Sequence, residues 1–150
     1  MIQVYSQIVD ENKWENINTD DIAKTAIELV DDIHEISEDK QVSIVFTSNS
    51  MVQELNNTYR GKDEPTNVLS FAFNDDGSNN LMLGELFIAY DVIEAESNSQ
   101  NKPFDNHLLH ILIHGVLHLL GYDHIEDVDA KEMEALEIEL LNKINIENPY

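Results

Sequence analysis

The 150-residue chain has no cysteine, no long apolar run and few basic side chains, and each shortage excludes a class of protein. Without cysteine there are no disulfides, thiolate metal sites, iron–sulfur clusters or cysteine nucleophiles, so any metal must bind histidine or carboxylate. No apolar run reaches the roughly 18 residues of a membrane-spanning helix, and the opening residues lack the pattern of a secretory signal. We therefore expect a cytoplasmic protein without a membrane partner.

Positive charge is scarce, since 8 Lys and Arg stand against 30 Asp and Glu, and the formal net charge is −22 at pH 7. Proteins that wrap nucleic acid non-specifically use a basic surface, so this balance argues against such binding and against DNA as a partner. Residues 19–36 and 125–141 read as helices whose acidic faces are solvated. No repeat or linker divides the chain, which at this length predicts a single domain spanning residues 1–150.

Hydrophobic periodicity predicts an α+β fold, a small mixed four-stranded sheet packed with about five helices. Strands are predicted at residues 2–8, 42–46, 68–73 and 83–90. Helices are predicted at residues 19–36, 48–59, 91–101, 103–120 and 128–144, with a turn at 74–80. We expect the aromatic side chains of Trp14, Phe71 and Phe73 in the core rather than as platforms for RNA bases.

The helix predicted at residues 103–120 is apolar in nearly every direction, which is typical of a central, buried helix. Its one polar stripe consists of histidines at helical spacing: His107, His110, His114 and His118. His114 and His118 are four residues apart, so both rings can reach one ion. Gly121 can adopt the left-handed conformation that ends a helix, and the chain can then turn back to bring His124 in as a third ligand.

Three neutral imidazoles with one open position are typical of a catalytic zinc site. An isolated HxxxH pair is more often two ordinary core or surface histidines, whereas the full HxxxHxxGxxH pattern favours a metal. Metzincin proteases share this spacing, but they carry glutamate directly after the first histidine, where this chain has Gly115. The general base of those proteases is missing, so proteolysis is disfavoured.

The segment HGVLHLLGYDH, residues 114–124, resembles the signature of the YbeY family of bacterial ribosomal-RNA maturation factors. Further similar segments are LNNTYRGKDEPTNVLSF at 55–71, LGELFIA at 83–89 and EMEALEIELL at 132–141. The resemblance implies an α+β metallohydrolase domain with one zinc-type ion on His114, His118 and His124. It also implies a metal-dependent, single-strand-specific endoribonuclease in maturation of small-subunit (16S) ribosomal RNA and in ribosome quality control, with the small subunit or assembly proteins as partners.

Arg60 is the only arginine in the chain, and it matches the arginine of the family motif. Phosphodiester hydrolysis needs a fixed positive fork at the phosphate oxygens, which makes Arg60 the candidate catalytic and substrate-binding residue. A surface arginine paired with Asp63 or Glu64 would explain the same residue equally well. Either of two arrangements would reconcile RNA binding with the acidic composition: a locally positive cleft formed by the ion, Arg60, Lys62 and Lys102, or delivery of the substrate by a partner protein.

Other polar residues have weaker claims to a role. Asp123 and Glu85 could act as a proton acceptor or could support a metal ligand, although a purely structural role is more common for each. His110 could orient a ligand or contact substrate, or it could be a hydrogen-bonded core histidine. We expect no role for His107 or His34.

Two other functions remain open from the sequence. One is a non-catalytic ribosome-assembly factor in which the ion only holds the last two helices together. The other is a metallohydrolase that uses the same site on a different substrate.

Overall fold

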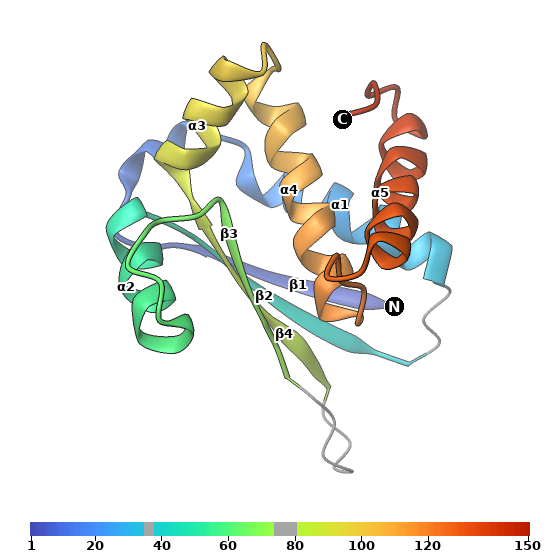
Figure 1. Ribbon diagram of the computed structural model, residues 1–150, viewed down its shortest axis with the longest axis horizontal. Helices are drawn as coiled ribbons and strands as arrows, with labels where there is room; N and C mark the ends of the chain where they lie inside the picture. The colour runs from blue at the N-terminus through green and yellow to red at the C-terminus, as the bar shows by residue number, and fades with distance from the viewer. Residues whose placement is uncertain (35–37, 74–80) are drawn as a thin grey trace.

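In the computed structural model, which describes residues 1–34, 38–73 and 81–150, four strands form one mixed sheet (Figure 1). They are β1 (Ile2–Ile8), β2 (Lys40–Thr47), β3 (Val68–Ala72) and β4 (Met82–Ala89), in the spatial order β1-β2-β4-β3. β1 and β4 run parallel to β2, whereas β3 pairs antiparallel with β4 at the edge. The predicted mixed sheet is confirmed.

Five α-helices surround the sheet in the part of the chain that the structure describes. They are α1 (Thr19–His34), α2 (Asn49–Arg60), α3 (Tyr90–Ser99), α4 (Phe104–Leu119) and α5 (Asp127–Asn142). A short 3-10 helix, η1 (Asn12–Asn16), was not predicted. The predicted end of the first helix, at residues 35–36, and the whole predicted turn at 74–80 lie outside the described residues. The predicted α+β class is confirmed.

The two faces of the sheet carry different helices (Figure 1). Alternate residues of β2 and β4 point toward α1 and α4 and form the main core with them. The opposite face packs against α2 through a smaller cluster of Val52, Leu69 and Ala89. Side chains alternate along a strand, so Val68 and Ser70 of β3 point toward α4. Leu69 and Phe71 point toward α2.

The predicted aromatic core is only partly confirmed. Trp14 is fully buried, and its indole Nε1 donates a hydrogen bond to the carbonyl oxygen of Thr47 at 2.9 Å. Phe71 is partly buried on the α2 face. Phe73 is 45% exposed, so its predicted burial is wrong. The reason is that α2 ends at Arg60, whose guanidinium lies over the Phe71 ring, and does not reach the end of the edge strand.

Helix α4 lies directly on β3 and β4, as its apolar sequence predicts. Gly115 makes this approach possible, because a Cβ atom there would lie 3.0 Å from Leu86 Cδ1 and 3.3 Å from Val68 Cγ2. A glutamate at this position, as in metzincins, would have no space between helix and sheet. None of the helices described by the structure is long and apolar enough to cross a membrane.

Candidate metal centre and cleft

The end of helix α4 brings three histidines together. His114 and His118 lie one turn apart on α4, which ends at Leu119. Gly121 follows with a φ of +103°, and its N–H donates to the carbonyl oxygen of His118 at 3.0 Å. The chain then turns back, and the His124 ring centroid lies 5.0 Å from that of His118. One ring nitrogen from each of the three histidines lies within 4.8 Å of the other two, as predicted for three ligands of one ion.

Hydrogen bonds determine which nitrogen of two rings faces the site. Nδ1 of His114 donates to the Glu137 carboxylate at 3.2 Å, and Nδ1 of His118 donates to the carbonyl oxygen of Tyr122 at 2.9 Å. In the neutral form of each ring, Nε2 is then the unprotonated nitrogen, and these two atoms lie 3.0 Å apart. Two lone pairs this close repel each other unless a cation lies beside them. Two nitrogens bound to one tetrahedral zinc ion would be about 3.3 Å apart, so the geometry fits such an ion.

The electrostatics also suit a metal. Burial lowers the pKa of His118 below its usual value, and the neighbouring His114 lowers this pKa further. His118 is therefore held in the neutral form that binds metals. His34, for which no role was expected, supports the loop that carries His124, because its Nε2 lies 2.8 Å from the Tyr122 hydroxyl.

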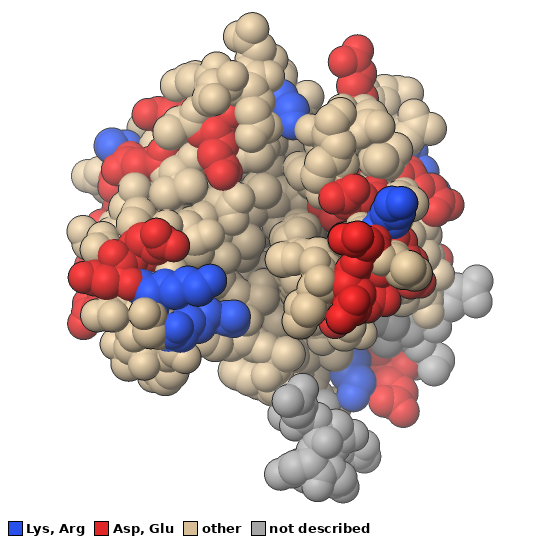
Figure 2. Space-filling view, viewed as in Figure 1, with Lys and Arg blue, Asp and Glu red and all other residues tan. Residues whose placement is uncertain are grey.

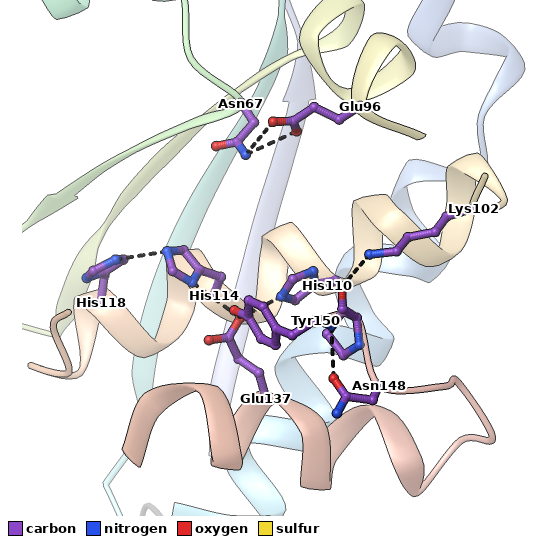
Figure 3. A network of polar contacts seen from close by, with 10 residues as sticks. Asn67, Glu96, Lys102, His110, His114, His118, Glu137, Asn148 and Tyr150 are labelled. Atoms are coloured by element: carbon purple, nitrogen blue, oxygen red, sulfur yellow. Dashed lines mark hydrogen bonds and ion pairs between the residues drawn. The ribbon is translucent and has the colours of Figure 1, made fainter. Parts of the chain in front are cut away.

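Glu137 on α5 is the residue that sequence analysis missed. Its Oε1 accepts hydrogen bonds from His110 Nε2 at 2.6 Å, His114 Nδ1 at 3.2 Å and the Tyr150 hydroxyl at 3.0 Å (Figure 3). Burial alone would raise the pKa of Glu137, but the hydrogen bonds from the two histidines outweigh it and lower the pKa to about 2. A signal was present, because Glu137 shares the apolar stripe of α5 with Met133 and Leu140.

The three histidines line one wall of a cleft of about 630 Å³. The opposite wall comes from the end of α2 and from β3, and it includes Arg60, Lys62 and Ser70. Arg60 Nη2 donates to the carbonyl oxygen of Ser70 at 2.7 Å, and the guanidinium lies 5.3 Å from the Phe71 ring centroid. The ion pair of Arg60 with Asp63 or Glu64 that remained possible from the sequence does not form among the described residues.

Charge differs between the two sides of the cleft. Figure 2 shows Lys and Arg side chains gathered on the α2 side of a hollow and acidic side chains gathered over α5. The cleft lining contains Arg60 and Lys62, but also Glu64 and Asp123. Lys102 does not line this cleft, because its Nζ donates to the carbonyl oxygen of Pro149 at 2.6 Å. Lys102 therefore does not contribute to the predicted positive cleft, and the basic side chains lie on the α2 side only.

Among the described residues, no hydrogen bond joins the side chains of Asp123, Glu85 or His110 to the three histidine rings. Asp123 lines the cleft, and its carboxylate accepts from the backbone N–H of Ile125 at 3.3 Å, which stabilises the turn. Glu85 points to the sheet face opposite α4 and accepts from the Ser43 hydroxyl, so it is not placed to act as a base. His110 contacts Glu137 and not a ring of the cluster.

His107 has the structural place expected for it. It is 3% exposed, and its Nε2 lies 2.9 Å from Glu96 Oε1. That hydrogen bond lowers the pKa of Glu96, although burial of this carboxyl opposes the shift. The pair ties α4 to α3 and does not line the cleft of the histidine cluster.

The chain is similar over most of its length to proteins of one named family. A family model described as Endoribonuclease YbeY matches residues 6–145. A protein named Endoribonuclease YbeY from Francisella philomiragia subsp. philomiragia is 45% identical over 140 residues, which is 89% of this chain and 87% of the relative. Its namesake from Francisella tularensis subsp. novicida is 44% identical over 89% of this chain and 85% of the relative.

A solved structure has the same fold. The solution structure of TM1509 from Thermotoga maritima superposes with a TM-score of 0.60 at 26% sequence identity. The match covers 96% of this chain and 91% of that chain. The similarity therefore extends over both the histidine helix and the elements that form the opposite wall of the cleft.

Proposed function

Because the chain belongs to the YbeY endoribonuclease family, we propose that it is a metal-dependent endoribonuclease that hydrolyses phosphodiester bonds in single-stranded RNA. The observation that carries this proposal is the placement of three histidine ring nitrogens and Arg60 on opposite walls of one cleft. The two walls suit a phosphate group, because one can hold a cation and the other presents guanidinium N–H donors.

His114, His118 and His124 would hold one divalent ion, which we propose to be zinc because the ligand set is three neutral imidazoles. When bound, the ion would supply Lewis-acid chemistry, polarising a phosphate oxygen and lowering the pKa of water. The Nδ1 hydrogen bonds of His114 and His118 keep both Nε2 lone pairs directed into the cleft. These contacts set the rings in place before a ligand arrives.

Arg60 would bind the phosphate from the other wall. A guanidinium has five N–H donors, and the hydrogen bond to Ser70 uses one of them, which leaves the others for phosphate oxygens. The same hydrogen bond and the Phe71 ring fix the orientation of the side chain. Lys62 extends the positive side of the cleft and would contact the RNA backbone next to the cleaved bond.

Small-subunit (16S) ribosomal RNA is the substrate that we propose, with roles in its maturation and in ribosome quality control. The similarity of residues 55–71 and 114–124 to the family motifs supports this assignment. The net charge of −22 favours entry of RNA only from the basic side of the cleft, and it suits delivery of the substrate by a small-subunit or assembly protein.

The test is cleavage of a labelled single-stranded RNA that covers the terminus of small-subunit ribosomal RNA. We expect the wild type to bind about one zinc ion, to cut this RNA and to cut a duplex of the same sequence more slowly. Chelation should abolish cleavage and zinc should restore it, whereas His118→Ala should lose both metal and cleavage.

A contaminating nuclease would survive His118→Ala when all proteins are purified identically, and equal cleavage by both proteins would overturn the proposal. Metal binding without RNA cleavage would instead favour a non-catalytic assembly factor whose ion is structural. Cleavage of a different ester or phosphate by the metal-loaded protein would favour another hydrolase.

A further inference from the structure

Glu137 differs from the other acidic residues that the structure describes because it is fully buried, with 0% exposure. It comes from the middle of α5, a helix whose remaining acidic residues are exposed or partly exposed. One oxygen, Oε1, accepts all three of its hydrogen bonds, from His110, His114 and Tyr150 (Figure 3). One of these partners, His114, belongs to the histidine cluster of the cleft.

Stability alone is a poor explanation for a carboxylate at this place. Removing a charged group from water costs several kcal/mol, and replacing a buried ionic group with a well-packed apolar residue is often neutral or stabilising. Met133 and Leu140, one turn away on the same stripe, show that this face of α5 accepts apolar side chains. A role beyond packing α5 against α4 therefore accounts better for Glu137.

The contact with His114 supplies such a role. A carboxylate can only accept hydrogen bonds, so it requires the proton of His114 to be on Nδ1 and leaves the lone pair on Nε2. That Nε2 faces the Nε2 of His118 at 3.0 Å, in the direction of the cleft. A carboxylate behind a histidine ligand also fixes the orientation of the ring and makes its free nitrogen more basic.

We propose that Glu137 is a positioning residue that fixes the tautomer and orientation of His114 for metal binding, and that Tyr150 holds the Glu137 carboxylate in place. This inference rests on the proposed metal site and deepens it. It extends the site from the end of α4 to helix α5 and to the segment at residues 148–150.

Tyr150 is an exposed residue, with 60% exposure, but its hydroxyl reaches this network. Its hydroxyl donates to Glu137 Oε1 at 3.0 Å, and its ring centroid lies 5.4 Å from that of His110. Burial and the Glu137 carboxylate raise the pKa of Tyr150, so the phenol remains a donor. Lys102 Nζ donates to the neighbouring carbonyl oxygen of Pro149 at 2.6 Å, which ties the segment to the connection between α3 and α4.

The test compares Glu137→Gln with Glu139→Gln, because both remove one carboxylate from the same helix and Glu139 is exposed. Glutamine has nearly the same shape, but it is neutral and donates from its amide nitrogen. Histidine tautomers are read in the metal-free protein by long-range proton–nitrogen NMR correlations. Zinc affinity is measured by competition with a chromophoric chelator, and both readouts are independent of RNA cleavage.

In the wild type and in Glu139→Gln we expect His114 to be protonated on Nδ1 and zinc affinity to be equal. In Glu137→Gln we expect a mixture of His114 tautomers and a loss of zinc affinity of about 10- to 100-fold. Tyr150→Phe should lower zinc affinity by up to about tenfold, because one hydrogen bond to the carboxylate is lost. This second variant carries the test if Glu137→Gln does not fold.

Unchanged tautomers and unchanged zinc affinity in Glu137→Gln, or in Tyr150→Phe if that variant carries the test, would overturn the inference while the wild type still binds metal. Failure of the wild type itself to bind zinc would contradict the proposed metal site instead. The two failures are therefore distinguishable in the same titration.

Discussion

Replacing Arg60 should separate phosphate binding from folding. The folded protein loses one hydrogen bond to Ser70 and one cation–π contact with Phe71 in Arg60→Ala. These are worth about 0.5–1.5 and 0.5–1 kcal/mol, so the free energy of unfolding should fall by about 1–2.5 kcal/mol. Loss of a donor that stabilises charge in the transition state costs about 2.7–4 kcal/mol, or roughly 100- to 1,000-fold in kcat. The catalytic loss should therefore exceed the loss in stability.

The assay measures kcat and KM on labelled single-stranded RNA at a temperature where every variant is folded, together with urea unfolding and zinc content. Arg60→Lys keeps the positive charge but lacks the planar set of N–H donors of a guanidinium. Compared with Arg60→Ala, it should therefore restore RNA binding more than kcat. Lys131→Ala serves as the control, because it removes an exposed cation outside the cleft. A decrease in kcat below tenfold for Arg60→Ala, with zinc retained, would refute the phosphate role and leave Arg60 as a tie between α2 and β3.

Three further predictions concern packing and pH. The Glu137 pKa of about 2 in the folded protein lies below the usual 4.5, so the metal-free fold is about 3 kcal/mol more stable with Glu137 ionised than with Glu137 protonated, and this difference is lost as pH falls from 4.5 toward 2. Urea unfolding between pH 7 and pH 3 should show a steeper loss for the wild type than for Glu137→Gln, and parallel curves would contradict the pKa assignment. Gly115→Ala should destabilise the fold, because a Cβ atom 3.0 Å from Leu86 Cδ1 costs about 1–3 kcal/mol against a gain in helix propensity of up to about 1 kcal/mol. Thermal unfolding and zinc titration should show lower stability and weaker zinc binding. A raised melting temperature would contradict this prediction, because it would mean that Leu86 and Val68 can shift to accommodate the Cβ atom. Trp14→Phe should cost about 1–3 kcal/mol in urea unfolding, because it leaves the buried Thr47 carbonyl oxygen without its donor, and cleavage by the folded fraction should not change.

The histidine cluster could be predicted because its geometry is local. His114, His118 and His124 lie within eleven residues, and helical spacing with a left-handed Gly121 is sufficient to bring them together. The mixed sheet and the central place of α4 were also predictable, since continuous apolar residues on α4 and alternation on the strands are strong signals.

Contacts between distant segments could not be predicted in the same way. Glu137 lies 23 residues after His114, and its role depends on how α5 packs against α4. The sequence left open whether Glu85 and Lys102 lie at the cleft, because strand register decides which sheet face Glu85 occupies and a distant carbonyl oxygen binds Lys102. Phe73 was predicted from alternation alone, which does not show where the covering helix ends.

The position of Glu137 in the chain has a consequence for biosynthesis. All three histidines and every residue that lines the cleft are synthesised by residue 125, whereas the carboxylate that contacts His114 follows on α5. With Glu137 as the positioning residue, a chain that is still growing on the ribosome has its histidines before it has full metal affinity. Under the proposed roles of the three histidines and Glu137, the metal site is complete only after α5 has left the exit tunnel and folded against α4.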